Sequence, residues 1–384
     1  MIFDDLHLLV EFTDFCNEKC GYCKQADFKT IHGEMPKRFL QFDQLIRLVE
    51  GLKNNKLKVT ALHPIWIGES LLHPQIAEML SYLFIQNKQY NLFRGFVLNT
   101  NATLMSPQIS DILMDHACYV QEHAGEYHYF RIHFSLDTIR EETYSKIRQV
   151  PGKLLDQAMR NIDYILQQRR RLNLVVPNFT FAFIVLNENF GEAEEFLEFW
   201  SRKLGDSGVL FEVTSHWPTA VDKDSIYFRR CEGGFPPNVA ELYEQVTTRL
   251  GLSKDLTTPS VQNPNAPRPP CAALWRTPTI AASGVVVPCC IDADVTLPVG
   301  TLSHNTLDEI WGGPAITDLR LAHIRGAFEK YPTCHQCTAS ERGDVPPEDV
   351  IRYLEAIGKS EEIEPYLQRM RVIKTQESNV NHGT

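Results

Sequence analysis

The chain has 384 residues and a mass of 44.0 kDa, enough for a sizeable core and more than one domain. Apolar residues make up 43% and charged residues 22%, which excludes disordered and fibrous classes. The net charge of -10 argues against nucleic-acid partners. No apolar run approaches the ~20 residues of a membrane-spanning helix, and the first residues lack a signal-peptide pattern. We therefore expect a cytoplasmic protein without a membrane partner.

The first half alternates between β-rich runs and amphipathic helical stripes. Strands are expected at residues 7–13, 59–67, 92–98, 129–136, 178–186 and 209–214. Apolar residues at helical spacing, such as Phe42, Leu45 and Val49, fill the intervals. Repeated β-then-α units predict an α/β fold with parallel strands, either an open sheet or a barrel. Ligands then belong at the carboxyl ends of the strands.

This alternation stops near His216, and a proline-rich stretch at 259–270 marks a boundary. We expect a barrel domain over 1–215 and a linker or insertion with a helix over 216–264. A smaller domain over 265–342 should contain a β-hairpin that turns at Ser283-Gly284 and a helix over 307–328. Residues 343–384 should form a helical tail.

Seven of the ten cysteines fall into two sets. Clustered thiols in a reducing compartment more often bind metal or do chemistry than form disulfides. Cys16, Cys20 and Cys23 directly follow the first expected strand. Three thiolates can hold three corners of a cubane iron–sulfur cluster and leave one iron open for catalysis. The alternative is a zinc knot with His32 as the fourth ligand.

The spacing CxxxCxxC resembles the hallmark of the radical S-adenosylmethionine (SAM) superfamily. Three later segments are similar to that family's signatures in the same order. Each follows an expected strand: residues 67–74 (IGESLLHP) resemble GGEPLLHP, 99–102 (NTNA) resemble TNG, and 135–137 are SLD. Ile67 and Ser70 depart from the first of these signatures.

The resemblance implies a partial (β/α)6 TIM-like barrel in which Cys16, Cys20 and Cys23 ligate a [4Fe–4S] cluster. SAM would chelate the open iron. The resemblance assigns the cofactor contacts as follows: Gly68 and Glu69 at the methionine amino group, Ser135 and Asp137 at its carboxylate or the ribose, Tyr22 near the adenine, and Asn101 in the TNG-like segment.

The second set is Cys271, Cys289, Cys334 and Cys337, whose spacing around Gly284 is similar to the opening of the family's SPASM domain. No cysteine follows Cys337, so the resemblance is to the shorter "twitch" form with one auxiliary [4Fe–4S] cluster. Four thiolates leave no open iron, so this cluster should transfer electrons. By spacing alone, a four-cysteine zinc site remains the alternative.

Within the superfamily the chain most resembles 2-deoxy-scyllo-inosamine dehydrogenase-like enzymes. That resemblance implies reductive cleavage of SAM to a 5′-deoxyadenosyl radical and hydrogen abstraction from a small polar substrate, such as a sugar or aminocyclitol. The auxiliary cluster would accept an electron as the substrate is oxidised. A flavodoxin- or ferredoxin-type reductant is the expected partner.

The sequence offers several candidate catalytic residues at expected strand ends. Glu11, His63 and His216 are candidate bases, and Cys231 is a candidate hydrogen donor if the enzyme is instead a radical epimerase. Arg229-Arg230 could hold an anionic substrate. Two other functions stay open: peptide modification in ribosomal-peptide maturation, and a non-catalytic zinc-binding interaction protein.

Overall fold

The structure, a computed structural model, describes residues 3–23, 38–54, 56–123, 129–206, 208–231, 238–253, 267–337 and 345–381. His32, considered above as a zinc ligand, and most of the proline-rich segment lie outside the described residues. Within these ranges, every helix is too short or too polar to cross a bilayer.

One sheet organises the described part of the chain, in the order β10-β9-β8-β1-β2-β3-β4-β5-β7-β6. Every pairing among β1 to β7 is parallel, which confirms the expected α/β fold. The parallel strands are β1 (Phe3–Val10), β2 (Leu57–His63), β3 (Phe93–Thr100), β4 (Tyr129–Ser135), β5 (Asn178–Val185), β6 (Phe211–Thr214) and β7 (Asp224–Arg230).

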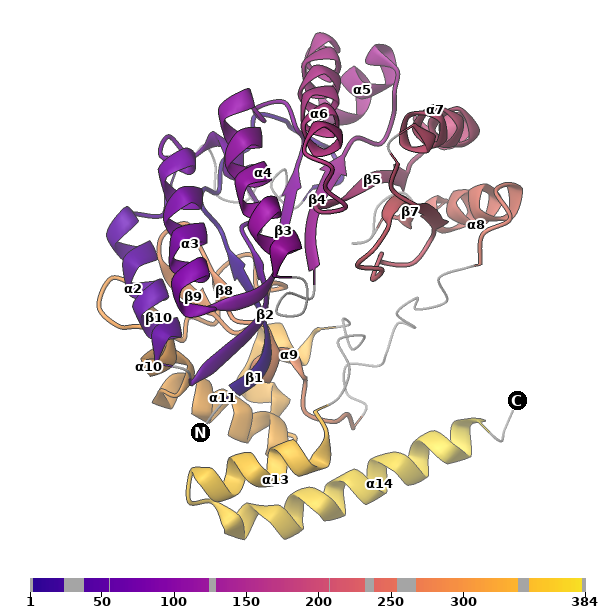
Figure 1. Cartoon of the computed structure of the whole chain (residues 1–384). Helices are drawn as coiled ribbons and strands as arrows, with labels where there is room; N and C mark the ends of the chain where they lie inside the picture. Colours follow the sequence, from indigo (N-terminus) through magenta and orange to yellow (C-terminus); the bar gives the residue numbers. More distant parts are fainter. Residues whose placement is uncertain are drawn as a thin grey trace.

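Helices cover the outer side of this sheet (Figure 1). They are α2 (Phe42–Lys53), α3 (Ile76–Tyr90), α4 (Pro107–Glu122), α5 (Glu141–Arg148), α6 (Lys153–Arg171), α7 (Ala193–Gly205) and α8 (Val239–Arg249). Phe130 and Phe134 of β4 are buried in the core, and Trp200 of α7 stacks on Phe181 of β5 at 3.8 Å. Because side chains alternate along a strand, Arg131 and His133 face the opposite, inner side.

β7 is an element that the sequence analysis missed. We expected residues 209–214 to be the sixth strand, and they form β6 at the edge of the sheet, whereas the unexpected β7 lies between β6 and β5. The segment 215–223 joins β6 to β7 across the inner side, because Arg131 donates hydrogen bonds to the carbonyls of Pro218 and Ala220. Trp217 on this segment stacks against His133 with ring centroids 5.4 Å apart. The parallel sheet therefore continues into the segment expected to be a linker.

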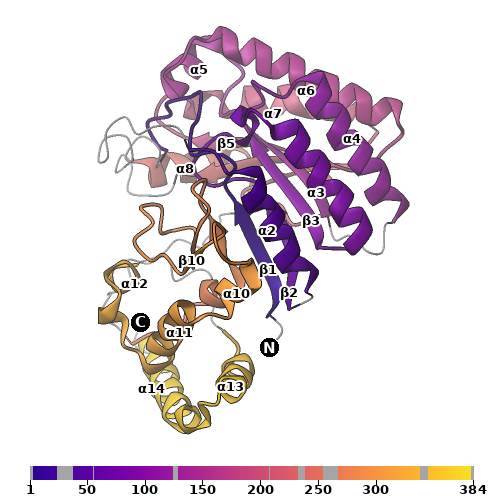
Figure 2. The same ribbon diagram turned by 90° about the vertical axis from the view of Figure 1, so that its left-hand side faces the viewer.

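The C-terminal region extends the same sheet through a hairpin. β8 (Thr279–Ile280) pairs in parallel with β1 and antiparallel with β9 (Val285–Val287), which also pairs with β10 (Gly300–Thr301). Gly284 has a φ of 81°, so the predicted turn is confirmed. Figure 2 shows this region beside β1, at the end of the sheet away from α7.

The expected helix over 307–328 is instead two helices. Gly312 and Gly313 separate α10 (Leu307–Trp311) from α11 (Pro314–Arg325), which starts with a proline at its first turn. The other helices are α9 (Ala273–Arg276), α12 (Pro332–His335), α13 (Pro347–Ala356) and α14 (Ile363–Asn381). α13 and α14 pack below α11 and end the chain as helices (Figures 1 and 2).

Candidate active site

The first cysteine loop follows β1 at the carboxyl edge of the sheet. Burial is the main cause that raises the pKa of the Cys16 and Cys20 thiols, the latter to about 11. The thiols also act on one another: Cys20 raises the pKa of Cys16, and Cys23 raises that of Cys20. Buried thiolates this close together repel, and cationic iron offsets that repulsion. The donor types therefore suit an iron–sulfur cluster, although no three His, Cys, Asp or Glu side chains among the described residues are positioned to hold a metal ion in this structure.

A buried arginine at the end of α5 connects this loop to the end of β4. Arg148 Nη1 donates to Glu18 Oε2 at 3.1 Å and to Cys20 Sγ at 3.4 Å. Its Nη2 donates to Asp137 Oδ2 at 2.7 Å, and the Tyr22 hydroxyl donates to the same oxygen at 2.6 Å. Three residues of the cysteine loop are thus held by one arginine–carboxylate pair.

Asp137 was expected at the methionine carboxylate or the ribose. The structure gives both of its oxygens protein donors, since Oδ1 accepts from the Ile184 backbone at 2.8 Å. The residue is fully buried, with a φ of 66°. These hydrogen bonds position Tyr22 and Arg148, and the contact of Asp137 with the cofactor stays a prediction.

Gly68 brings the loop after β2 against the cysteine loop. A Cβ at this position would lie 1.9 Å from the carbonyl oxygen of Thr13, so only glycine fits without a backbone shift. The next residue, Glu69, is buried and accepts from the Thr100 hydroxyl at 2.9 Å and the Asn101 backbone at 2.8 Å. The ends of β2 and β3 are therefore joined through one carboxylate.

Glu69 lies close enough to Cys16 that its charge raises the pKa of that thiol, second to burial. Burial in turn raises the pKa of Glu69 to about 7. Asn101 Nδ2 donates to Asn17 Oδ1 at 2.9 Å and approaches Cys16 Sγ at 4.0 Å. Ser135 is half-buried at the end of β4. The expected cofactor residues thus lie at neighbouring strand ends around the first cysteine loop.

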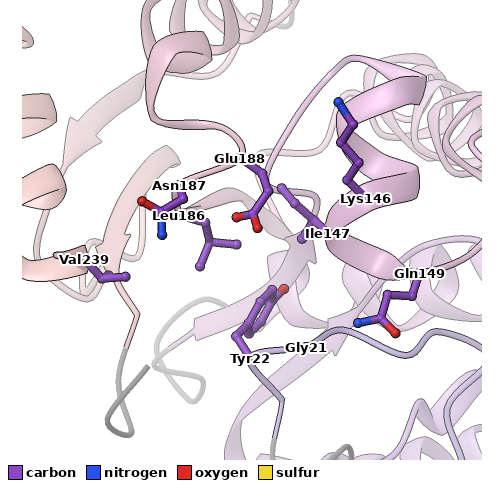
Figure 3. Close-up of a pocket in the computed structure, with 9 residues that line it drawn as sticks. All are labelled: Gly21, Tyr22, Lys146, Ile147, Gln149, Leu186, Asn187, Glu188 and Val239. Atoms are coloured by element: carbon purple, nitrogen blue, oxygen red, sulfur yellow. The ribbon is translucent and has the colours of Figure 1, made fainter. Parts of the chain in front are cut away.

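A cavity of about 260 Å³ opens beside Tyr22. It is lined by Gly21, Tyr22, Lys146, Ile147, Gln149, Leu186, Asn187, Glu188 and Val239. In Figure 3, Tyr22, Leu186 and Glu188 point toward a common space, whereas Lys146 points away from it. An aromatic wall, aliphatic side chains and a few polar groups suit a planar ring with polar substituents.

The second cysteine set lies in the C-terminal region, on segments far apart in the sequence. Burial, followed by the neighbouring Cys271 and Cys337 thiols, raises the pKa of Cys334 to about 12. The Cys271 amide donates to His323 Nδ1 at 3.4 Å, and Cys289 Sγ accepts from the Ile291 amide at 3.4 Å. Cys334 therefore lies near Cys271 and Cys337, and these partly buried thiols again suit a cationic iron–sulfur centre by donor type.

Glu11, a candidate base, has both carboxylate oxygens engaged by backbone donors. Oε1 accepts from Ile67 at 2.9 Å and from Gly68 at 3.4 Å, and Oε2 accepts from Ala282 at 3.0 Å. Burial raises its pKa to about 7 against the effect of these hydrogen bonds. The geometry supports a positioning role, in which Glu11 ties the β2 loop to the C-terminal hairpin.

The other candidate catalytic residues lie apart from one another. His216 is exposed after the edge strand β6, and its Nε2 lies 3.2 Å from Ser253 Oγ. Cys231 is half-buried directly after β7, at the carboxyl edge. His63 ends β2, and burial, with a smaller contribution from His7, lowers its pKa to about 3. Of these residues, His63 is the last residue of β2 and Cys231 directly follows β7, and both strands lie inside the sheet.

Sequence reasoning missed a row of polar side chains on the inner side of the sheet. Asn99 pairs in register with His133, and His133 pairs with Thr180. Asn99 Oδ1, His133 Nδ1 and Thr180 Oγ1 are buried without a hydrogen-bond partner among the described residues. Buried polar atoms are nearly always paired, so an unpaired row indicates a place for water or a ligand. Strand alternation could have located these residues, but the pairing register could not be read from one sequence.

Arg148 and Glu18 were also missed. Glu18 lies inside the cysteine motif and carried no signal of its own, while Arg148 lies 128 residues after Cys20 on a separate helix. Only the folded chain brings them together.

Two family models match the chain. Residues 10–199 match the radical SAM superfamily, and residues 271–338 match the SPASM iron–sulfur cluster-binding domain. A radical SAM domain implies a [4Fe–4S] cluster and SAM, and a SPASM domain implies an auxiliary iron–sulfur cluster. The predicted cofactors are thereby confirmed.

Among curated proteins, GTP 3′,8-cyclase from Clostridium perfringens (strain SM101 / Type A) is 22% identical over 169 residues. The match spans 44% of this chain and 45% of that protein, so the chain matches less than half of that relative's length. The relative's activity therefore does not carry over.

Two solved structures illustrate the fold. Streptococcus suis SuiB bound to S-adenosylmethionine is 14% identical with a TM-score of 0.51, covering 88% of this chain and 72% of SuiB. BtrN in complex with AdoMet and 2-DOIA is 12% identical with a TM-score of 0.44, covering 88% and 93%. The likeness to SuiB shows the fold alone, and the likeness to BtrN carries no argument about the substrate.

Proposed function

We propose that this chain, which carries a radical SAM domain over residues 10–199 and a SPASM domain over residues 271–338, oxidises a small polar substrate. A sugar or aminocyclitol-like alcohol is the proposed substrate class, and the auxiliary [4Fe–4S] cluster is the proposed electron acceptor. When bound, the first cluster and SAM supply the hydrogen-abstracting radical. A flavodoxin- or ferredoxin-type protein is the proposed reductant.

We assign the first cluster to Cys16, Cys20 and Cys23, and the auxiliary cluster to Cys271, Cys289, Cys334 and Cys337. Among the cofactor residues, Gly68 supports this assignment through its close approach to Thr13. Asn101 supports it through its approach to Cys16. Asp137 and Arg148 would hold the loop that carries Tyr22 in place. The cavity beside Tyr22 has room for a planar ring.

The observation that carries the substrate class is the inner row of Asn99, His133 and Thr180. An amide oxygen, an imidazole nitrogen and a hydroxyl, each without a partner in the described part of the chain, suit the hydroxyl or amino groups of a compact polar molecule. A hydrocarbon would leave all three atoms unsatisfied, at about 1–3 kcal/mol for each buried group.

The second cysteine set supports oxidation as the proposed direction of the reaction. Oxidation of a secondary alcohol to a ketone removes one hydrogen atom, one proton and one electron. A cluster held by four thiolates has no open iron for other chemistry, so it is suited to accepting the electron. Trp66 Nε1 donates to the Cys290 carbonyl at 2.8 Å, so the loop after β2 contacts the segment that carries Cys289.

Radical epimerisation is the second candidate, because Cys231 directly follows β7 at the carboxyl edge of the sheet. A cysteine there could return hydrogen to the opposite face of the substrate. Deuterium from solvent in the product, lost in Cys231→Ala, would favour epimerisation. A product two mass units lighter than the substrate, unchanged by Cys231→Ala, would favour oxidation.

The deciding experiment is anaerobic incubation of the iron-loaded protein with SAM, dithionite and a panel of aminocyclitols and sugars. We expect about eight iron and eight sulfide per chain, 5′-deoxyadenosine, and a ketone product. Thr180→Val should raise KM, whereas Thr375→Val on α14 should not. Zinc without iron, or iron without SAM cleavage, would contradict the proposal. Product formed only from a peptide would replace the proposed substrate class.

A further inference from the structure

Two arginines distant in sequence meet beside the second cysteine set, and one of them contacts the turn that carries Cys334 and Cys337. Arg268 Nη1 donates to the Cys337 carbonyl at 2.8 Å, and Nη2 donates to the Cys334 carbonyl. The guanidinium carbon lies 4.4 Å from the centroid of the Phe328 ring, which restricts its orientation. A fixed positive charge therefore lies on the backbone of two proposed cluster ligands.

Arg369 on α14 holds this arrangement from the other side. Its Nη1 donates to the Arg268 carbonyl at 2.8 Å, and its Nη2 donates to the His323 carbonyl at 2.7 Å. Its Nε donates to the Ile324 carbonyl at 3.1 Å. A guanidinium stays charged at neutral pH, so α14 adds a second cation behind the first. The C-terminal helix is thus part of the surroundings of the auxiliary cysteines.

The charge of Arg268 reaches the second cysteine set, and that of Arg369 reaches the neighbouring His323. Arg268 lowers the pKa of Cys334 against the larger increase caused by burial and the neighbouring thiols. Burial, followed by Arg268 and Arg369, lowers the pKa of His323 to about 3. His323 Nδ1 accepts from the Cys271 amide at 3.4 Å and so connects the Arg369 contact to a second proposed ligand.

One carboxylate opposes the two arginines. Asp292 is buried and raises the pKa of Cys334. Its oxygens accept from the Thr296 amide at 2.9 Å, the Thr296 hydroxyl at 2.6 Å and the Leu297 amide at 2.8 Å. These three donors stabilise the Asp292 carboxylate, whose charge acts on Cys334 against the larger effect of Arg268.

We infer that Arg268 and Arg369 raise the reduction potential of the auxiliary cluster and so favour its one-electron reduction. Reduction adds a negative charge to an already anionic cluster, and nearby cations and hydrogen-bond donors stabilise that charge. The role of this tuning in catalysis rests on the proposed function. In that reaction the substrate radical loses one electron, the cluster gains it, and the hydroxyl proton leaves to a base or to solvent. Both arginines are positioning residues, because they act through the cluster.

The test measures the potential directly and needs no substrate. In a Cys16→Ala/Cys20→Ala/Cys23→Ala background, which should retain only the auxiliary cluster, redox titration followed by electron paramagnetic resonance reports its midpoint. We expect Arg268→Gln to disfavour reduction about tenfold, which is about 59 mV for one electron. Arg369→Gln should shift the midpoint in the same direction by less, and Arg268→Lys should restore most of the loss. Arg325→Gln, which removes an exposed cation paired with Glu362, is the matched control.

A midpoint unchanged in Arg268→Gln and Arg369→Gln at full iron content would overturn the inference. If Arg268→Gln loses iron, Arg369→Gln decides, because it removes a cation without touching the Cys334–Cys337 turn. A lowered midpoint supports the inference even if the protein oxidises no alcohol, so its failure and that of the proposed function remain distinguishable.

Discussion

Arg148 and Asp137 form a buried ion pair in which Nη2 and Oδ2 are 2.7 Å apart, and their side chains are 4% and 0% exposed. The pair lies between the end of β4 and the first cysteine loop, because the same guanidinium also reaches Glu18 and Cys20. A buried pair adds little net stability, but breaking it leaves one charge unpaired. Its evident use is to hold the loop in one geometry.

Arg148→Met should therefore lower the free energy of unfolding by about 3–5 kcal/mol, because it leaves two buried carboxylates without their cation. The amount of iron bound at the first cysteine set should also fall in this variant. Urea unfolding and iron analysis measure both effects. The matched control is Arg202→Gln, which breaks an exposed pair with Glu198 and should change stability by less than about 1 kcal/mol. Wild-type iron content in Arg148→Met would contradict the assigned role.

Gly68→Ala should disrupt the site because its Cβ would lie 1.9 Å from the Thr13 carbonyl oxygen, and the backbone would have to move. We expect weaker SAM binding and a loss of about 2 kcal/mol or more of stability. Gly205→Ala is the control, since nothing lies within 4 Å of the added carbon. At the end of α7 it should be neutral or stabilise by up to about 1 kcal/mol. Equal behaviour of the two variants would refute the close-approach argument.

His133 should make stability depend on pH. Burial, with Arg229 and then Arg131, lowers its pKa to about 3. As the pH falls below about 6.5, the unfolded chain takes up a proton that the folded chain does not, so stability falls. His133→Phe, which can keep the stack on Trp217, should reduce this slope by up to about 1.4 kcal/mol per pH unit.

Urea unfolding between about pH 5 and pH 6.5 measures the difference between variant and wild type. The comparison is needed because burial also lowers the pKa of His63, His116 and His323 to about 3. His304→Phe, at an exposed position, serves as the control. Parallel pH profiles for wild type and His133→Phe would show that His133 does not titrate as described.

Substitutions in the two cysteine sets should have different effects on SAM cleavage and on product formation. Cys16→Ala should abolish SAM cleavage, because two thiolates cannot hold the first cluster. Cys334→Ala should block product formation more than it blocks cleavage of SAM, since the electron acceptor is lost. Counting 5′-deoxyadenosine and product side by side measures this uncoupling. Cys118→Ala, a half-buried residue packed against the core, should leave the ratio unchanged. A proportional loss of both activities in Cys334→Ala would argue against the auxiliary cluster as acceptor.

The parallel sheet was predictable because its signal is local. Alternation and apolar spacing mark β1 to β5 within a few residues, and short motifs mark the strand ends that carry Gly68, Glu69 and Asn101. The edge of the sheet at β6 and β7 was harder to predict. β6 and β7 are joined without a helix, so their order depends on pairings that no local pattern encodes.

By itself the sequence determined the fold class, the two cysteine sets and the cofactors that their spacing and neighbouring motifs imply, because metal ligands and strand ends depend on residues close together in the chain. Only the tertiary structure decided which side chains surround them. Arg148 reaches Cys20, Glu11 accepts from Ala282, and Arg369 bonds to Arg268. The physical reason is that burial and long-range packing determine which groups a carboxylate or a guanidinium contacts.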